Sequence, residues 1–296
     1  MIHRWHILGA GAIGRLFACK LHHLHLAPVL VLRAGARGES IIIRRRSEHD
    51  ESIKVASVGA DHLQDGEIAG LLVTTKANNA VAAVEACLPS LAAGAPVILL
   101  HNGMGVLEML RERYPGLALY AGTTTEGAHL DGELLVHAGL GETEIGGGDT
   151  PDWFGPWAEG SERIRWCEDI DDALWKKLVI NCAINPLTAL HRCRNGALLD
   201  NPTLRAEVEL LCEELAAVSA ARGNPRGAGC ALDWALGVIQ RTADNQSSML
   251  QDVLGGRHTE IRYITGYLVR EAERLGVPVP RNAALLRQLD SPTLSN

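Results

Sequence analysis

The sequence predicts an α/β domain built on a parallel sheet, followed by an all-helical domain. In the first 170 residues, short apolar runs alternate with segments long enough for helices, which is typical of strand–helix–strand units. From about Asp172, long helically periodic segments replace the strand signals. The chain has 296 residues, which fits two domains of roughly 150 residues each. We place the boundary between residues 169 and 170, where an acidic stretch precedes a helix.

The expected elements follow this division. The first domain contains candidate strands at Trp5–Leu8, Pro28–Leu32, Leu71–Thr75, Pro96–Leu100 and Leu117–Ala121, with an antiparallel continuation at Leu134–His137 and Thr143–Ile145. The second domain contains candidate helices at Ala173–Asn185, Pro202–Arg222, Ala231–Thr242 and Thr259–Leu275. Gly276 followed by Pro278 indicates a stop for the last of these helices.

Composition argues against several classes of function. The net charge of −7 argues against nucleic acid as a main partner, because phosphate binding requires clustered positive charge. No apolar run approaches the roughly 18 residues of a membrane-spanning helix, and the first residues lack the long apolar core of a signal peptide. The seven cysteines are scattered without a Cys-x-x-Cys pair, which favours a reducing compartment without disulfides or structural zinc. We therefore expect a cytoplasmic protein with no nucleic-acid and no membrane partner.

A glycine motif follows the first expected strand. Gly9, Ala10, Gly11, Ala12, Ile13 and Gly14 form a Gly-x-Gly-x-x-Gly pattern that opens a helical segment. In this context Gly9 makes the tight turn, Gly11 lets the backbone approach a pyrophosphate, and Gly14 lets helix and strand pack closely. The helix N-terminus then offers free N–H groups to the phosphates. The motif predicts a dinucleotide site, and the alternative is a plain junction between strand and helix.

The end of the second expected strand indicates which dinucleotide is bound. A site for NAD would place an acidic residue about 20 residues after the motif, to bond the ribose 2′-hydroxyl. This chain has Arg33 there, and no acidic residue before Glu39. An arginine pairs with a 2′-phosphate, which an acid would repel. We therefore favour NADP(H), and the alternative is that Arg33 is a surface charge without a ligand.

Polar residues also follow three successive strands. Lys76 comes after the strand at Leu71–Thr75, Asn102 comes after the strand at Pro96–Leu100, and Gly122–Thr125 follows the next one. Open α/β sheets bind ligands at the carboxyl ends of their strands. We therefore expect one crevice, in which Asn102 bonds the nicotinamide ribose or the substrate.

The second domain carries a polar stripe on an otherwise apolar helix. Lys177, Asn181 and Asn185 recur at i, i+4 and i+8, so they share one face. Buried lysine and asparagine side chains need partners, which predicts that the stripe lines a polar cavity, unless it only bonds neighbouring backbone. Lys176 lies off this stripe and is the weaker candidate for catalysis. Pro186 is expected to end or kink the helix.

A second polar group and one carboxylate complete the candidates. The run Asp244–Asp252 has more hydrogen-bonding side chains than a core needs and too little charge for a plain solvated face. Glu260 comes in the first turn of the helix expected at Thr259–Leu275, where a carboxylate is favoured. Helix capping alone would explain Glu260, so its role stays open on these grounds.

The order of these motifs resembles the ketopantoate reductase family, which is part of the 6-phosphogluconate dehydrogenase-like group. The resemblance runs from residue 7 to about residue 280. The glycine motif is unspecific, whereas the Lys–Asn helix followed by Ser-Ser-Met-Leu-Gln-Asp is highly specific. The matching stretches are Gly9–Gly14, Val73–Ala77, His101–Gly105, Gly122–Thr125, Trp175–Asn181, Ile184–Ala189, Asn195–Gly196, Ser247–Asp252 and Arg257–Ile261.

The resemblance implies an NADP-binding Rossmann domain at residues 1–169 and a helical substrate and catalytic domain at residues 170–296, with the active site between them. It implies Lys177 and Glu260 as the catalytic residues. The substrate-binding residues that it implies are Asn102, Asn181, Asn185, Asn195, Asn245, Ser248, Met249, Leu250 and Gln251. The cofactor-binding residues that it implies are Gly9, Ala10, Gly11, Ala12, Ile13, Gly14, Arg33, Lys76, Asn102, Ala128 and Glu260. The chain departs from the family pattern at Glu126, where histidine is more common, and at Arg262 and Thr265.

The activity implied by the resemblance is NADPH-dependent reduction of ketopantoate, a small 2-oxo acid, to pantoate in pantothenate biosynthesis. The motifs leave open another small 2-oxo acid or an opine-type imine as the substrate. A sensor or scaffold that binds NADP(H) without turnover is a second alternative. A metal enzyme is the third, prompted by His22, His23 and His25, but these have no Cys, Asp or Glu at ligand spacing, so we expect no metal. The sequence leaves the oligomeric state open, with a homodimer as a candidate.

Overall fold

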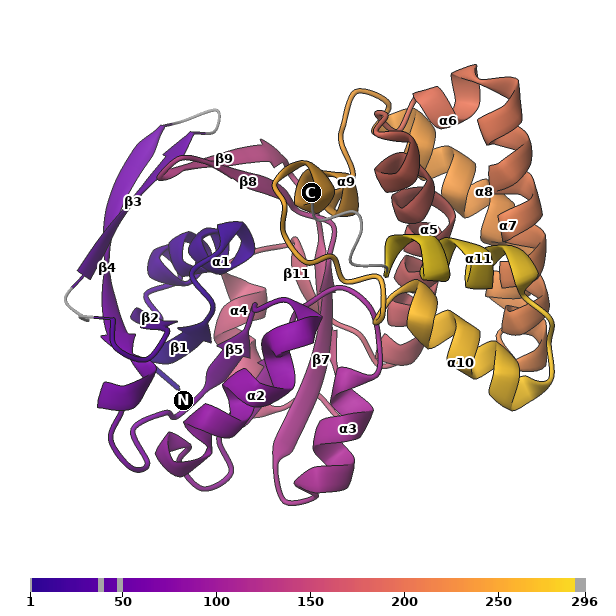
Figure 1. Ribbon diagram of the computed structural model, residues 1–296. Coiled ribbons are helices and arrows are strands. Elements are labelled where there is room, and N and C mark those ends of the chain that lie inside the picture. Colours follow the sequence, from indigo (N-terminus) through magenta and orange to yellow (C-terminus); the bar gives the residue numbers. More distant parts are fainter. Residues whose placement is uncertain (1, 37–39, 47–49, 291–296) are drawn as a thin grey trace. The chain divides into compact units, whose positions relative to one another are not determined.

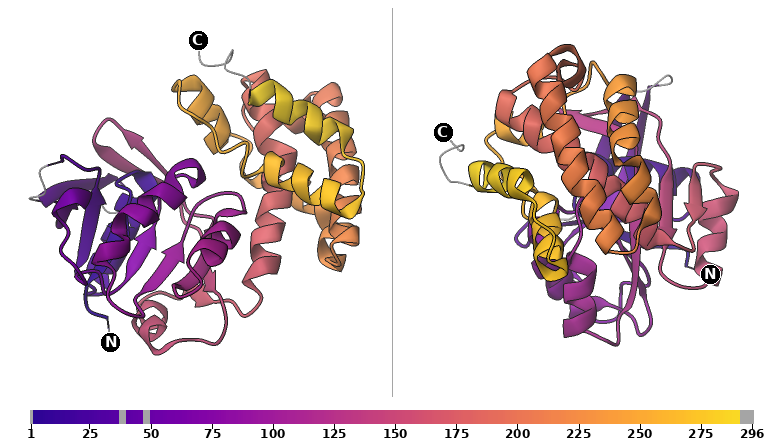
Figure 2. Two further views of the ribbon diagram at one scale, coloured as in Figure 1. Left: turned by 60° about the horizontal axis from the view of Figure 1, so that its bottom comes forward. Right: turned by 90° about the vertical axis from the view of Figure 1, so that its right-hand side faces the viewer.

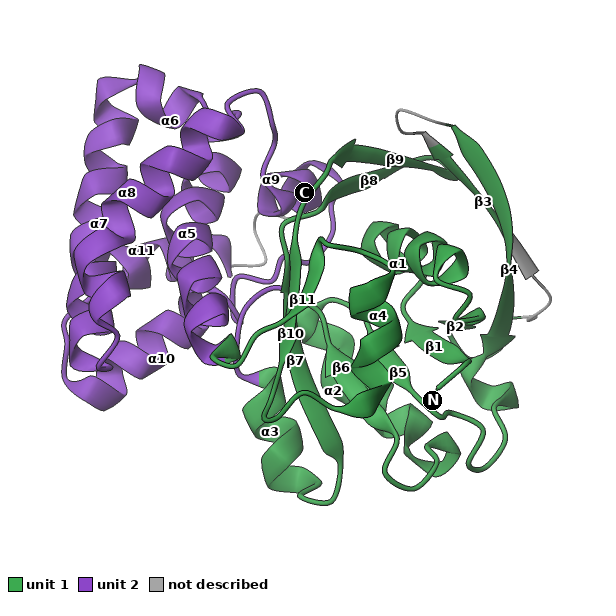
Figure 3. Cartoon of the chain, turned by 180° about the vertical axis from the view of Figure 1, so that it is seen from behind, with its two compact units in different colours: residues 1–101, 106–170 green, residues 102–105, 171–296 purple. Residues whose placement is uncertain are grey.

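The computed structural model describes residues 2–36, 40–46 and 50–290. The chain divides into two compact units, coloured separately in Figure 3: unit 1 comprises residues 1–101 and 106–170, and unit 2 comprises residues 102–105 and 171–296. Residues 102–105 thus belong to the helical unit, although only two residues separate them in the chain from a strand of unit 1 that ends at Leu99. Within the described ranges, none of the helices combines the length and the apolar character that a membrane span requires.

Unit 1 is built on one mixed sheet. Its described strands are β1 (Trp5–Leu8), β2 (Pro28–Leu32), β3 (Ser40–Arg46), β4 (Glu51–Gly59), β5 (Leu71–Val73), β6 (Pro96–Leu99), β7 (Ala118–Thr124), β8 (Gly127–Asp131), β9 (Leu134–Gly139), β10 (Thr143–Gly146) and β11 (Ile164–Trp166). They lie in the order β11-β10-β7-β6-β5-β1-β2-β4-β3-β9-β8. The five strands from β7 to β2 in this order run parallel. β1 and β6 are buried at every residue, which is why they read as continuous apolar runs.

The parallel part of the sheet contains the topological switch point of a doubly wound fold. Helices α1 (Ala12–His23), α2 (Ala77–Cys87) and α3 (Val106–Arg113) follow β1, β5 and β6, and α4 (Gly155–Glu159) comes later in the chain. β1 pairs with β2 on one side and with β5 on the other, so the connections after β1 and β5 leave in opposite directions. Ligands of such sheets bind outside the carboxyl ends of the strands at this point.

The sheet curls back on itself around α1. β7 and β8 stand far apart in the strand order, yet only Thr125 and Glu126 separate them along the chain. Figure 1 shows β4, β3, β9 and β8 arching around α1. α1 buries Leu16 and Phe17 in one apolar core with Leu135 of β9. The curl therefore brings β8 close to the end of β7.

Unit 2 is helical throughout its described regular elements. These are α5 (Ile170–His191), α6 (Ala197–Asp200), α7 (Pro202–Ala221), α8 (Pro225–Arg241), α9 (Ser248–Leu254), α10 (Thr265–Leu275) and α11 (Pro280–Leu289). α5 contributes Trp175, Leu178 and Cys182 to the core of the unit. α7 and α8 pack side by side, as Figure 2 shows. Asn201 and Asn224 cap these two helices by accepting hydrogen bonds from backbone N–H groups of the first turn.

Several helix boundaries differ from those expected, and two of them bear on the candidate site. α5 and α8 begin earlier than expected, at Ile170 and Pro225. α5 does not end at Pro186 but continues to His191, because its last turns are buried in the core and packing outweighs the missing N–H. Thr188 adds hydrogen bonds from Oγ1 to the carbonyl groups of Ile184 and Asn185. The last long helix expected at Thr259–Leu275 begins only at Thr265, so Glu260 precedes it and is not in its first turn.

Candidate active site

The glycine loop between β1 and α1 has two positions at which only glycine fits. Gly9 has a φ of +112°, in the left-handed region, and a Cβ on Gly14 would overlap the carbonyl oxygen of Gly9. Thr74, which follows β5, directs its hydroxyl to the carbonyl oxygens of Leu8, at 3.2 Å, and Gly9, at 3.0 Å. Thr74 therefore fixes the shape of the loop. No local pattern in the sequence indicates this role of Thr74, because it depends on a contact between segments that are distant in the chain.

Gly11, in contrast, borders open space. A Cβ on Gly11 would meet no described atom within 4 Å. Gly11 is also the N-cap of α1, and no described side chain caps this helix. Room beside the backbone and unsatisfied N–H groups at a helix N-terminus are what a phosphate group requires. The loop, with Ala10, Ala12 and Ile13 partly exposed, therefore fits the pyrophosphate of a dinucleotide.

Further predicted cofactor residues follow strands that neighbour β1. Arg33 comes directly after β2, and Lys76 comes shortly after β5 as the N-cap of α2. Because β1, β2 and β5 are adjacent and parallel, these residues and the glycine loop lie along one edge of the sheet. The Arg33 side chain is exposed and the Lys76 side chain is half-buried. Ala128 lies in β8, opposite His137 of β9.

The polar stripe predicted from the sequence lies on α5 of unit 2. Lys177 and Asn181 are partly exposed, whereas Asn185 is buried. Lys176 takes a different direction, since its Nζ lies 5.4 Å from the ring centroid of Trp234 on α8. The two neighbouring lysines of α5 therefore have distinct surroundings, and Lys176 offers a matched control for Lys177.

Glu260 connects two of the candidate residues in unit 2. Its Oε2 accepts a hydrogen bond from Asn102 Nδ2 at 3.0 Å. Burial lowers the pKa of Lys177 to about 8, and the charge of Glu260 opposes this lowering. The N–H of Met104 donates to the carbonyl oxygen of Tyr263 at 2.9 Å, which fixes the segment after Asn102 beside the one after Glu260. Lys177 is thus an ammonium whose proton is held less tightly than that of a solvated lysine.

Asn195 presents an unsatisfied acceptor in unit 2. Its backbone N–H donates to the carbonyl oxygen of Asn245 at 3.0 Å, and its Nδ2 donates to Thr242 Oγ1 at 2.8 Å. Its Oδ1 is buried and has no hydrogen-bond partner among the described residues. Leaving a buried acceptor unpaired costs about 1–3 kcal/mol, which a ligand that donates a hydrogen bond would recover. The Asn245 side chain itself is exposed.

Ser247, which precedes the predicted Ser248, has a structural role that the sequence did not reveal. Ser247 is the N-cap of α9, and its Oγ accepts a hydrogen bond from the N–H of Leu250 at 3.1 Å. The same Oγ shares a hydrogen bond of 2.7 Å with Oγ1 of Thr188 on α5. Thr188 and Ser247 therefore tie the start of α9 to the helix that carries Lys177.

The predicted substrate residues of α9 differ in how far their side chains are exposed to solvent. Ser248 is exposed, and Gln251 is half-buried with its Nε2 donating to the carbonyl oxygen of Gln246 at 3.2 Å. The side chains of Met249 and Leu250 are buried in the protein, so these two residues can offer a ligand only backbone atoms.

The histidines that prompted a metal hypothesis lie at the end of α1 and just beyond it. His23 pairs with Glu51 at 3.0 Å, and its ring contacts that of His22 edge to face. In the part of the chain that the structure describes, no group of three or more His, Cys, Asp and Glu residues is placed to hold a metal ion.

Two family models match the chain. The one described as ketopantoate reductase PanE/ApbA matches residues 5–150, and the one for the C-terminal part of the same family matches residues 169–292. A 2-dehydropantoate 2-reductase of Yersinia pestis is 37% identical over 284 residues, which are 94% of this chain and 91% of that protein.

Solved structures share the fold over nearly the whole chain. A PanE/ApbA family ketopantoate reductase from Ralstonia eutropha matches with a TM-score of 0.84 at 25% identity, covering 99% of this chain and 98% of that one. D-mandelate dehydrogenase, in a ternary structure with NADH and anilino(oxo)acetate, matches with a TM-score of 0.86 at 20% identity over 99% and 98% of the two chains. At 20% identity the likeness shows the fold alone.

Proposed function

The chain belongs to the ketopantoate reductase PanE/ApbA family, and we propose that it reduces 2-dehydropantoate (ketopantoate) to pantoate with NADPH, a step of pantothenate biosynthesis. One observation carries the proposal. The ammonium of Lys177 shares a helix face with Asn181 and Asn185, and burial lowers its pKa to about 8. A donor with a pKa near the working pH is efficient in proton transfer.

Reduction of a ketone requires a hydride, a proton and stabilisation of the charge that develops on oxygen. NADPH supplies the hydride to C2 of the substrate when it is bound. Lys177 Nζ donates a hydrogen bond to the ketone oxygen and gives up its proton as negative charge forms there. Glu260 acts through Lys177, because its charge favours the ammonium form. The lysine then regains a proton from solvent.

The remaining polar groups of unit 2 are proposed to hold the substrate. Asn181 and Asn185 continue the Lys177 face of α5, where their amides can bond the carboxylate or hydroxyl. The unpaired Oδ1 of Asn195 suits the hydroxyl of ketopantoate, which can donate a hydrogen bond. Ser248 offers an exposed hydroxyl at the start of α9. Asn102 and Asn245, and the backbone at Met249, Leu250 and Gln251, complete the proposed set.

The cofactor is a nicotinamide dinucleotide in this family, and NADPH specifically is our proposal. The open space at Gly11 fits the pyrophosphate. The exposed Arg33 after β2 suits the 2′-phosphate that distinguishes NADPH from NADH. Gly9 to Gly14, Lys76, Asn102, Ala128 and Glu260 are the other residues proposed to face the cofactor.

Replacing Arg33 with alanine is expected to weaken NADPH binding while leaving NADH binding unchanged. A hydrogen bond between charged groups contributes enough that its loss raises the Kd about ten- to hundredfold. The Kd of each cofactor can be measured by calorimetry at low ionic strength, with Arg113→Ala as a control because Arg113 pairs with Glu85 on α2. An equal loss of affinity for both cofactors would count against a 2′-phosphate role for Arg33.

Steady-state oxidation of NADPH tests the proposed activity directly. We expect turnover with ketopantoate, a higher kcat/KM with NADPH than with NADH, and lower kcat/KM for other branched 2-oxo acids. Apolar contacts discriminate by only about 1–3 kcal/mol per methylene, so related acids are expected to react slowly rather than not at all. A preference for another 2-oxo acid or an imine would reassign the substrate. Tight NADPH binding without any turnover would instead indicate a non-catalytic sensor.

The pH dependence of turnover is expected to follow Lys177. Because the ammonium donates the proton, kcat for reduction should fall as the pH rises through the pKa of about 8. Glu260→Gln removes the charge that favours the ammonium, so the fall should move to lower pH. Profiles of kcat from pH 6 to 10 measure this shift, with Glu273→Gln on the exposed side of α10 as the control. An unmoved profile in the Glu260 variant would rule out this coupling.

The cellular location and assembly are also proposals. All seven cysteines are free thiols, which supports the reducing cytoplasm predicted from their spacing. A homodimer is the candidate assembly, and sedimentation of the purified protein decides between monomer and dimer.

A further inference from the structure

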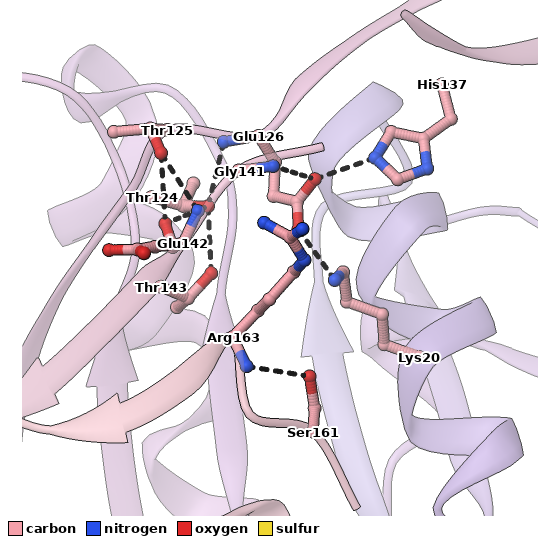
Figure 4. A network of polar contacts seen from close by, with 10 residues as sticks. All are labelled: Lys20, Thr124, Thr125, Glu126, His137, Gly141, Glu142, Thr143, Ser161 and Arg163. Carbon is pink, nitrogen blue, oxygen red and sulfur yellow. Dashed lines mark hydrogen bonds and ion pairs between the residues drawn. The ribbon is translucent and has the colours of Figure 1, made fainter. Parts of the chain in front are cut away.

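Glu126 is a fully buried carboxylate at the point where the curled sheet returns to the end of β7. Its Oε1 lies 2.6 Å from Nζ of Lys20 on α1, and the two side chains are 0% and 15% exposed, respectively. Its Oε2 accepts hydrogen bonds from Nε2 of His137 on β9, at 2.7 Å, and from the N–H of Gly141, at 3.0 Å. Figure 4 shows these groups reaching the carboxylate from separate segments of unit 1.

The cluster formed by Glu126, Lys20, His137 and Gly141 keeps the Glu126 carboxylate charged. Burial by itself would raise the pKa of Glu126, but the hydrogen bonds from Lys20 and His137, the charge of Lys20 and the N–H of Gly141 together hold the pKa below its usual value. Apolar residues often stabilise a protein as well as a buried ion pair does. Packing alone therefore does not explain why a charged pair occupies this position.

The backbone beside Glu126 is held as firmly as its side chain. A Cβ on Gly141 would overlap the peptide between Thr125 and Glu126, so the chain before β10 lies directly against that peptide. Thr125 donates its N–H to the carbonyl oxygen of Glu142 at 2.9 Å, and Glu142 donates its N–H to Thr125 Oγ1 at 2.9 Å. The N–H of Glu126 donates to Thr124 Oγ1 at 3.2 Å. The turn after β7 is thereby fixed on both sides.

Both ends of the cluster lead to proposed cofactor residues. Lys20 belongs to α1, the helix whose first turn carries the glycine loop. Ala128 comes two residues after Glu126 and pairs with His137 in the ladder between β8 and β9. The carboxylate therefore joins the helix proposed to hold the phosphates to the strand whose Ala128 is also proposed to face the cofactor.

A second contact from α1 reaches the same hairpin. Arg15 donates from Nε to the carbonyl oxygen of Ala10, at 3.0 Å, and from Nη1 to that of Glu133, at 3.2 Å, in the turn between β8 and β9. α1 is thus attached to both ends of β8, through Arg15 at the turn and through Lys20 at Glu126. A helix attached at two points transmits the position of the glycine loop to the whole strand.

We propose that Glu126 is a positioning residue of the cofactor site, which sets the distance between the glycine loop and Ala128 through its contacts with Lys20 and His137. The inference rests on the proposed function, because it takes the glycine loop and Ala128 as the two cofactor contacts that must be kept in register. A glycine loop displaced from this register would lose a charge-assisted hydrogen bond to the phosphates, and the loss of one such bond raises a Kd about ten- to hundredfold.

The test compares Glu126→Gln with Glu85→Gln, since Glu85 bonds Arg113 and Tyr114 in the same unit and has no contact with the cluster. We expect Glu126→Gln to raise the Kd for NADPH about ten- to hundredfold, the effect of losing one charge-assisted hydrogen bond to the cofactor. The KM for ketopantoate at saturating NADPH should stay near the wild-type value, because the proposed substrate residues lie in unit 2. Glu85→Gln should change neither constant.

The double variant Lys20→Met, Glu126→Gln separates positioning from stability. It removes both charges, so thermal stability should recover relative to Glu126→Gln, which leaves Lys20 unpaired. The Kd for NADPH should stay raised, because the contact itself is still missing. This variant also serves if Glu126→Gln alone does not fold. Hydrogen exchange of the wild-type protein adds an independent readout, since NADPH should slow exchange in residues 123–128 and 137–141.

The outcomes distinguish the inference from the function on which it rests. A wild-type protein that does not bind NADPH would refute the proposed function. A wild-type protein that binds NADPH, together with a folded Glu126→Gln or double variant of unchanged Kd, would overturn the positioning role. Unaltered exchange in both segments on NADPH binding would do the same.

Discussion

Lys177→Ala is expected to lower the kcat for ketopantoate reduction by about 10²- to 10⁴-fold, the usual contribution of a positioned general acid. The Kd for NADPH should change little, because the proposed phosphate and ribose contacts lie elsewhere in the chain. Turnover and cofactor affinity, measured separately by stopped-flow absorbance and calorimetry, therefore test whether the ammonium acts in the chemical step rather than in binding.

Lys176→Ala provides the matched control for this variant. Lys176 is the preceding residue of the same helix, but its ammonium lies over the ring of Trp234. Its removal should cost a modest amount of stability, about 0.5–1 kcal/mol for an exposed cation–π contact, and leave kcat near the wild-type value. Near-normal turnover in Lys177→Ala, or a larger loss in Lys176→Ala, would reject Lys177 as the acid.

The lowered pKa of Lys177 is expected to reduce the free energy of unfolding at neutral pH. Its pKa falls from 10.5 in the unfolded chain to about 8 in the folded one, so the folded protein binds fewer protons between these two pH values. The free energy of unfolding should therefore rise as the pH increases from about 8 to 10.5, and the full penalty should apply at neutral pH. Lys177→Met removes the penalty and is expected to be at least as stable as the wild type at pH 7.

The sequence predicted the buried parts of the fold better than its edges. β1 and β2 occupy the expected residues, because their short length, the glycine or proline beside them and their β-branched residues favour strand over helix for an apolar run. β3 and β4 were not predicted. In β4, Ile53, Val55 and Ser57 are buried at alternate positions, but the apolar alternation in the sequence is short because Ser57 is polar and Ala56 and Val58 beside it are apolar. β3 is harder to recognise, because the arginines that end it resemble a loop and its partners come from β4 and β9.

Within the candidate site, periodicity revealed side chains that share one element. The Lys177 stripe was predicted because residues four apart on a helix share a face. Thr74, Thr188 and Glu126 act through contacts between segments that are distant in sequence, and no local pattern predicts such contacts. Glu260 was expected in the first turn of a helix, but that helix begins only at Thr265. The position of Glu260 beside Asn102 depends on how residues 102–105 pack within unit 2, which no local pattern predicts.

Gly11→Val is expected to abolish high-affinity NADPH binding without damaging the fold. Gly11 has φ −73° and ψ −173°, an extended conformation that valine adopts readily, and its Cβ would meet no described atom within 4 Å. The added side chain would occupy the space proposed for the pyrophosphate. Overpacking of this kind costs about 1–3 kcal/mol, so the Kd should rise by about ten- to hundredfold or more, with an unchanged melting temperature.

Gly14→Ala alters the same motif by a smaller group, but it is expected to lower the melting temperature, which Gly11→Val leaves unchanged. Its Cβ would overlap the carbonyl oxygen of Gly9 and crowd Thr74, so the junction of β1 and α1 must shift and the melting temperature should fall. Cofactor affinity would then fall as a consequence of the distorted loop. If both variants unfolded alike, Gly11 would not border a ligand space. If Gly11→Val bound NADPH as the wild type does, the glycine loop would not be the pyrophosphate site.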